Sequence, residues 1–74
     1  MIKILKGRVA QLKKKYPVGN RVRLIKMDDT QAPPIGTTGT VIGVDDIGSL
    51  LVQWDNGSSL NVIDRVDEVE LIND

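Results

Sequence analysis

The sequence predicts a mainly β fold, in which a small barrel of about five strands follows one N-terminal amphipathic, basic α-helix. Three observations lead to this prediction. Apolar residues recur every three or four positions at the start of the chain, they alternate with polar residues from Asn20 onward, and glycine-marked corners separate the alternating runs. Short strands with few residues between them are typical of small barrels, whose closure protects the strand edges. We therefore expect one domain over residues 1–74, with the helix at 1–15 and the barrel at 20–72.

The helix is expected at residues 2–15. Its apolar stripe has the three- and four-residue spacing of one helical face and consists of Ile2, Leu5, Val9, Leu12 and Tyr16. Gly7 weakens the helix by about 1 kcal/mol relative to alanine. Pro17 ends the helix, because the residue before a proline avoids the α region.

The strands follow from alternation and from turn residues. The long loop at 28–38 contains Pro33, Pro34 and Gly36, all of which favour turns. Gly43 indicates a bulge or a sharp bend inside the second strand. The expected elements are strands at 21–24 and 39–44, a turn at 45–48, a hairpin of strands 50–54 and 58–63, and a last strand at 69–72.

Two registers are open to this hairpin. A two-residue turn of Asn56 and Gly57 would place Leu60 and Val62 on the opposite face from Trp54. A three-residue turn with Gly57 in the left-handed region instead aligns five apolar residues on one face. These five are Leu50, Val52, Trp54, Leu60 and Val62. We expect the three-residue turn, because only that register buries one continuous apolar surface.

The composition excludes several kinds of chemistry. The chain has no cysteine and no histidine, which removes disulfides, thiol nucleophiles, the commonest general base and the commonest metal ligand. The acidic pairs at 28–29 and 45–46 lack the spacing of a calcium loop, and the glycines at 36 and 39 lack the features of a phosphate-binding loop. We therefore expect no enzyme, no cofactor and no metal site.

Membranes and aromatic-dependent ligands are also poor matches for this sequence. No apolar run approaches the ~20 residues of a membrane span, and residues 1–15 are too charged for a secretion signal. Tyr16 and Trp54 are the only aromatic residues, too few to line a groove for proline-rich peptides or to stack several bases. We expect a cytoplasmic protein with no membrane partner.

The formal net charge of zero conceals a segregation of charge along the chain. Residues 1–26 hold nine basic and no acidic residues, whereas residues 27–74 hold one basic and all ten acidic residues. The candidate partner-binding residues are the cations of the helix and the first strand, namely Lys3, Lys6, Arg8, Lys13, Lys14, Lys15, Arg21 and Arg23. Either these cations face a partner, or the helix docks on the acidic barrel and its lysines are solvated. We favour docking, which still leaves room for a basic outer surface.

Several segments of the chain resemble a bacterial family of short domains. They are the Tyr-Pro-Val-Gly step at 16–19, Arg-Val at 21–22, Met-Asp-Asp at 27–29, Gln-Ala-Pro-Pro at 31–34, Gly-Thr at 36–37, Gly-Thr-Val at 39–41, and the segments at 44–49 and 54–60. The family is catalogued as a domain of unknown function and occurs in Firmicutes, their phages and conjugative elements. The resemblance runs from about Leu12 to Val62, and the chain departs from the family's pattern after Ile63.

The resemblance implies an SH3-like β-barrel and a mobile-element context, and it carries over no catalytic or binding residues. A weaker likeness extends to KOW-type domains, which bind RNA or protein, but a likeness of fold is a weak guide to function. The sequence favours a small protein-interaction module, such as an accessory or host-antagonist protein of a phage or mobile element. Its basic helix or its 28–38 loop would contact another protein. The alternative is nucleic-acid binding through the basic helix and first strand, and self-association is a third option.

Overall fold

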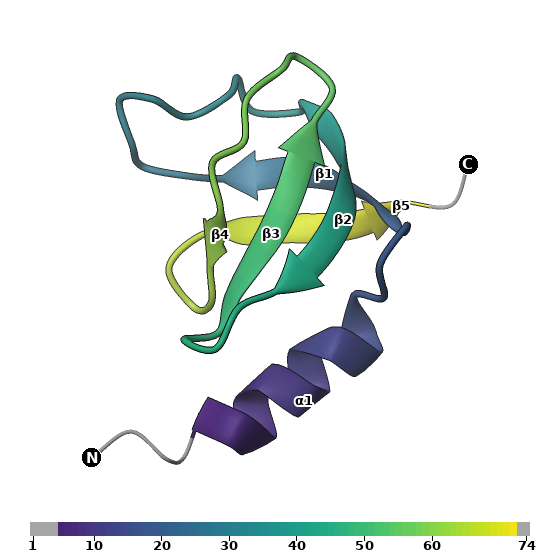
Figure 1. Ribbon diagram of the computed structural model, residues 1–74. Helices are drawn as coiled ribbons and strands as arrows, with labels where there is room; N and C mark the ends of the chain where they lie inside the picture. The colour runs from purple at the N-terminus through teal and green to yellow at the C-terminus, as the bar shows by residue number, and fades with distance from the viewer. Residues whose placement is uncertain (1–4, 73–74) are drawn as a thin grey trace.

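A computed structural model describes residues 5–72 and has one helix followed by five strands (Figure 1). The elements are α1 (Leu5–Lys15), β1 (Arg21–Lys26), β2 (Thr38–Val44), β3 (Ser49–Trp54), β4 (Val62–Ile63) and β5 (Glu68–Ile72). The helix ends at Lys15, two residues before Pro17, as the sequence predicts. The predicted contributions of Ile2 and Lys3 lie outside the described residues, and so do the side chains of Leu5 and Lys6.

The strands form one antiparallel sheet in the order β4-β3-β2-β1-β5, which confirms the mainly β fold. The sheet curves, so that β1 and β5 run across β2 and β3 (Figure 1). β4 and β5 are the two edges of the described sheet, so closure into a barrel is not confirmed. The shape nevertheless encloses one apolar interior.

The core comes from the alternating strands. Its fully buried side chains are Val22 and Leu24 from β1, Val41 from β2, and Val52 and Trp54 from β3. These side chains point inward at every second position, because successive residues of a strand face opposite sides of the sheet. Trp54 is 1% exposed, whereas its neighbour Gln53 is exposed.

The β3–β4 connection has the predicted three-residue turn. The Trp54 amide donates to the Ser58 carbonyl at 3.0 Å, Gly57 has a φ of 92°, and Leu50 lies opposite Val62. All three observations match the register that aligns Leu50, Val52, Trp54 and Val62, each of which is buried. Leu60, the fifth residue of the predicted apolar face, is only half-buried and is not part of the buried core cluster.

The predicted strand at 58–63 is too long, since only Val62 and Ile63 form β4. Local side-chain bonds replace the ladder before that point. The Asn56 side chain accepts from the Ser58 amide at 3.0 Å, and the Trp54 indole Nε1 donates to the Leu60 carbonyl at 2.9 Å. The Leu60 carbonyl thus bonds to a side chain of the core.

Two irregularities bend the sheet. Val41 lies opposite Val52 and Gly43 opposite Leu51, so Ile42 is the extra residue of the bulge that Gly43 indicated in the sequence. A second register shift lies between Leu24 and Lys26 in the β1–β5 pair, and the sequence pattern did not predict it. Bulges increase local twist, which lets a short sheet wrap around its own core.

Gly39 allows β2 and β3 to approach closely, and replacing it tests this contact. A Cβ at this position would lie 2.7 Å from Val52 Cγ1 and 2.9 Å from both the Gln53 carbonyl oxygen and Trp54 Cε3. Gly39→Ala should therefore lower the free energy of unfolding by about 1–3 kcal/mol, as overpacked cores do. Urea denaturation followed by tryptophan fluorescence measures the change.

Gly7→Ala is the matched control, because it makes the same chemical change on the exposed side of α1. A Cβ there meets no atom within 4 Å, and alanine is the better helix former. The control should leave the stability unchanged or raise it by up to about 1 kcal/mol. An equal loss in both variants would contradict the close approach at Gly39.

Candidate functional site

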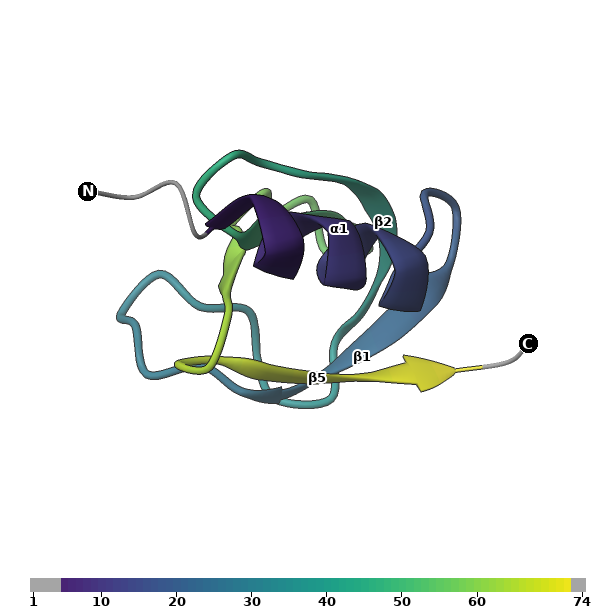
Figure 2. The same ribbon diagram turned by 90° about the horizontal axis from the view of Figure 1, so that it is seen from below.

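The helix α1 lies against the sheet, where it covers one mouth of the curved interior (Figure 2). Val9 and Leu12 are buried, and Tyr16 packs against the sheet core. The Tyr16 amide donates to the Leu12 carbonyl at 2.8 Å, which continues the helical pattern one residue past the end of α1. The apolar stripe of the sequence is therefore the docking face of the helix, as far as its side chains are described.

A bidentate ion pair connects the helix to the β4–β5 turn. Arg8 Nε and Nη2 donate to Asp64 Oδ2 and Oδ1 at 2.6 and 2.7 Å. Paired N–H donors of arginine match a carboxylate in both distance and direction. The hydrogen bond from Arg8 holds the pKa of Asp64 below its usual range, and the bond to Asp64 raises the pKa of Arg8.

The turn that carries Asp64 folds back on the edge of β4. The amides of Val66 and Asp67 donate to the Ile63 carbonyl at 3.1 and 2.9 Å, while the Ile63 amide donates to Asp67 Oδ2 at 2.9 Å. Arg65 has a φ of 67° at the apex of this turn. Both backbone polar groups of Ile63 are thereby satisfied within the turn.

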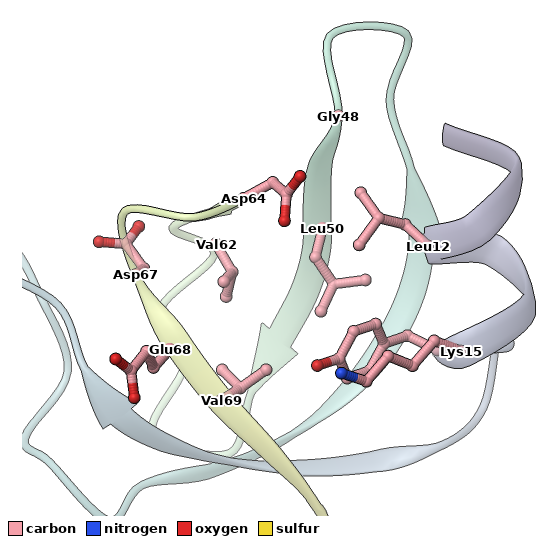
Figure 3. Close-up of a pocket in the computed structure, with 10 residues that line it drawn as sticks. Leu12, Lys15, Gly48, Leu50, Val62, Asp64, Asp67, Glu68 and Val69 are labelled. Carbon is pink, nitrogen blue, oxygen red and sulfur yellow. The ribbon is translucent and has the colours of Figure 1, made fainter. Parts of the chain in front are cut away.

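A groove of about 220 Å³ opens between α1 and β5 (Figure 3). Leu12 and Lys15 extend from α1 on one side, Val69 and Glu68 belong to β5 on the other, and Leu50 lies between the two elements. The apolar lining consists of Leu12, Tyr16, Leu50, Val62 and Val69, and the charged groups at its border are Lys15, Asp64, Asp67 and Glu68. An apolar floor with a few polar groups at the border is the usual construction of a binding site.

The predicted binding arginines are paired with carboxylates of the same chain. Arg21 Nη1 and Nη2 donate to Asp55 Oδ1 and Oδ2 at 2.9 and 2.5 Å, and Arg23 Nη1 donates to Glu70 at 3.2 Å. The bonds from Arg21 and from the Thr38 hydroxyl lower the pKa of Asp55. Together with Arg8, these arginines lie in three separate ion pairs instead of one basic patch.

The predicted lysines stand apart from those arginines. Lys13, Lys14 and Lys15 are exposed in the last turn of α1, and the Lys15 ammonium lies 5.3 Å from the centre of the Tyr16 ring. The last helical turn suits cations, because the helix dipole is negative there. Lys3 lies outside the described residues, and the structure does not describe the side chain of Lys6.

The acidic border of the groove was not predicted from the sequence. The predicted binding residues are all cations, whereas Asp64, Asp67 and Glu68 gather where β4 turns into β5. The signal in the sequence was an acidic turn between two apolar positions, Val62 and Val69, that share the core side of the sheet. The structure also places Pro33 of the 28–38 loop in a buried position, so that this loop packs on its own domain.

Within residues 5–72, no three acidic side chains are arranged to hold a metal ion. In that same part of the chain, the helix is too short and too polar to cross a membrane.

The family described as "Domain of unknown function (DUF4314)" matches residues 5–72. This match includes α1 and β5, and it extends beyond the span over which the sequence motifs were recognised. No curated protein matches the chain.

Acid should weaken the domain through Asp55 and Asp64. Both carboxyls have folded-state pKa values below their ordinary value of 3.8. A carboxyl group whose pKa is lower in the folded state than in the unfolded state stabilises the fold. This stabilisation is complete above the unfolded-state pKa and is lost as the pH falls through the folded-state pKa. The free energy of unfolding should thus be level near neutral pH and fall steadily below about pH 4.

Asp64→Asn isolates the part of this effect that belongs to the ion pair between Arg8 and Asp64. It should lower the stability at neutral pH by less than Gly39→Ala does and make the decline in acid shallower. Asp46→Asn, in the exposed β2–β3 turn, is the control and should preserve the neutral stability. Urea titrations across pH provide the measurement, and an Asp64→Asn profile parallel to the wild type would contradict the role of this pair.

Proposed function

The chain belongs to the DUF4314 family, for which no function is assigned, and we propose that it is a non-catalytic protein-interaction module that receives a partner protein in the groove between α1 and β5. The observation that carries this proposal is the groove itself. It has an apolar floor and charged sides, and both the helix and the sheet contribute residues to its lining. A small domain also gains stability whenever a partner binds only its folded form. Binding would therefore serve the fold as well as the function.

The charge distribution supports a protein partner over a nucleic acid. Nucleic-acid binding needs protein cations that are free to neutralise phosphates and displace the counterions of the nucleic acid. Arg8, Arg21 and Arg23 are each engaged by a carboxylate, which neutralises the arginines of the basic surface that the sequence suggested. The charges that border the groove are three carboxylates and one lysine.

Nucleic-acid binding is the second candidate, and one observation favours it. Lys13, Lys14 and Lys15 are exposed together at the end of α1, where they could contact neighbouring phosphates. We rank it below protein binding, because Arg8, Arg21 and Arg23, the predicted arginines of this surface, are paired with carboxylates of the same chain.

The biological setting is part of the proposal. The resemblance to a family of Firmicutes, phages and conjugative elements supports an accessory or host-antagonist role in the cytoplasm. A domain of this size would act by occupying a surface of a host protein. Self-association through the same groove is the third candidate, and the size of the pure protein in solution tests it.

Affinity capture from a nuclease-treated Firmicutes lysate separates the first two candidates. We expect the tagged wild-type domain to retain a stoichiometric protein after nucleic acid has been digested and at raised salt. A variant with Lys13 and Lys14 replaced by glutamine should retain the same protein, because neither of these exposed residues lines the groove. Loss of all partners on nuclease treatment, or in the lysine variant, would favour nucleic-acid binding and contradict the proposal.

A further inference from the structure

The edge of β5 has backbone groups that the sheet does not use. β5 pairs on one side with β1, where Arg21 lies opposite Ile72 and Arg23 opposite Glu70. On the other side of β1, Leu24 donates to the Thr37 carbonyl and accepts from the Gly36 amide. Successive residues of a strand bond to opposite neighbours, so that Arg21 and Arg23 face β5. By the same alternation, the amides and carbonyls of Val69 and Leu71 point away from β1.

This edge lies beside the apolar groove. Val69 lines the groove across from Leu12, and Leu71 is 40% exposed on the same side of β5. A further strand at this edge would therefore place alternate side chains over the groove and send the others to the outer surface. The groove requires apolar side chains at the inward positions, because its floor is formed by Leu50 and Val62.

The charges at the edge specify the outward positions of such a strand. Asp64, Asp67 and Glu68 border the groove at the start of β5, and Glu70 follows on the outer face. Arg23 pairs with Glu70 at 3.2 Å and Arg8 pairs with Asp64 at 2.6 Å, so that both of these carboxylates are already neutralised. Lysine or arginine side chains on an incoming strand would complement Asp67 and Glu68. Two copies of β5 would instead bring Glu68 and Glu70 toward their equivalents, and like charges on paired strands repel.

The other sheet edge is closed to a partner strand. The turn after β4 satisfies the amide and the carbonyl of Ile63, as described above. A depression does lie beside that edge, and its lining includes Asp28, Asp29, Ile63 and Asp67. It is acidic as well, but the backbone of β4 next to it has no free groups at Ile63 with which to pair a strand.

We propose that the partner binds as an added β-strand along β5, through an extended segment that alternates apolar and basic residues. This inference rests on the proposed protein-binding function and specifies its site and the chemistry of the partner. The backbone of the segment pairs with Val69 and Leu71, its apolar side chains enter the groove between α1 and β5, and its cations lie near Asp67 and Glu68. Backbone pairing supplies affinity in this mode, while side-chain pockets and charges supply specificity.

A short synthetic peptide that alternates lysine and valine is the direct probe. We expect it to bind the full chain and to shift the amide resonances of Val69, Leu71 and Gly48 in a two-dimensional NMR spectrum. A peptide of the same pattern with glutamate in place of lysine should bind at least about tenfold more weakly. Equal binding of the two peptides, or shifts confined to the lysines of α1, would overturn the proposal.

Two variants test the edge and the charge separately. Leu71→Pro removes an edge amide that pairs with no strand, so that it should leave the fold intact and weaken the lysine peptide about tenfold. Glu68→Lys reverses an exposed charge and should weaken the same peptide roughly fivefold. Circular dichroism verifies the fold of each variant. If Leu71→Pro is unfolded, the affinity of Glu68→Lys for the lysine peptide is the remaining test of strand addition. Unchanged affinity in folded variants would overturn strand addition.

The outcome for the captured protein distinguishes this inference from the proposed function. A partner retained by the wild type and lost with Glu68→Lys supports both. If the wild type and Glu68→Lys retain the partner equally, and the lysine peptide shifts only resonances away from β5, strand addition is wrong. The proposed protein-interaction function is then unaffected. Retention of no protein by the wild type overturns the interaction module itself.

Discussion

The burial of Trp54 is the constraint on which the rest of the structure depends. Its ring fills the centre of the sheet, and such a large side chain supplies a major part of the apolar burial of a small domain. The indole N–H must find a partner there, and it donates to the Leu60 carbonyl. That bond fixes the path of the chain after the turn and ends the regular pairing with β3. Gly39 is required for the same reason, since the ring lies against its backbone.

Electrostatics organises the outside of this core. The chain separates its charges along the sequence, and folding brings them together, with each paired arginine of α1 and β1 meeting a carboxylate from the later part of the chain. Exposed ion pairs contribute little to stability individually. Their geometry matters more here, because the pair of Arg8 and Asp64 sets the position of α1 and thus the width of the groove. The three arginines that suggest a binding surface in the sequence, Arg8, Arg21 and Arg23, thus form ion pairs within the domain.

Much of the fold could be predicted from local physics. The end of α1 before Pro17, the left-handed Gly57 in a three-residue turn and the bulge before Gly43 follow from backbone preferences and from the need to bury one apolar face. The short β4 could not be predicted, because the indole of Trp54 and the side chain of Asn56 replace its ladder. The groove could not be predicted from the sequence either, because it depends on the distance between α1 and β5, two elements at opposite ends of the described chain. Periodicity reveals which side of an element is apolar, but not whether another element covers it.

The pairing of β1 with β5 also governs how the protein is made. The register joins Arg21 to Ile72, so that the sheet draws together residues near the two ends of the described chain. During synthesis, β1 emerges early and must wait for residues 68–72 to leave the ribosomal tunnel before its second neighbour exists. Contacts that are so distant in sequence form late and slow the completion of a fold. In the interval the nascent chain presents the unpaired side of β1, which makes this the stage at which a chaperone would be of most use.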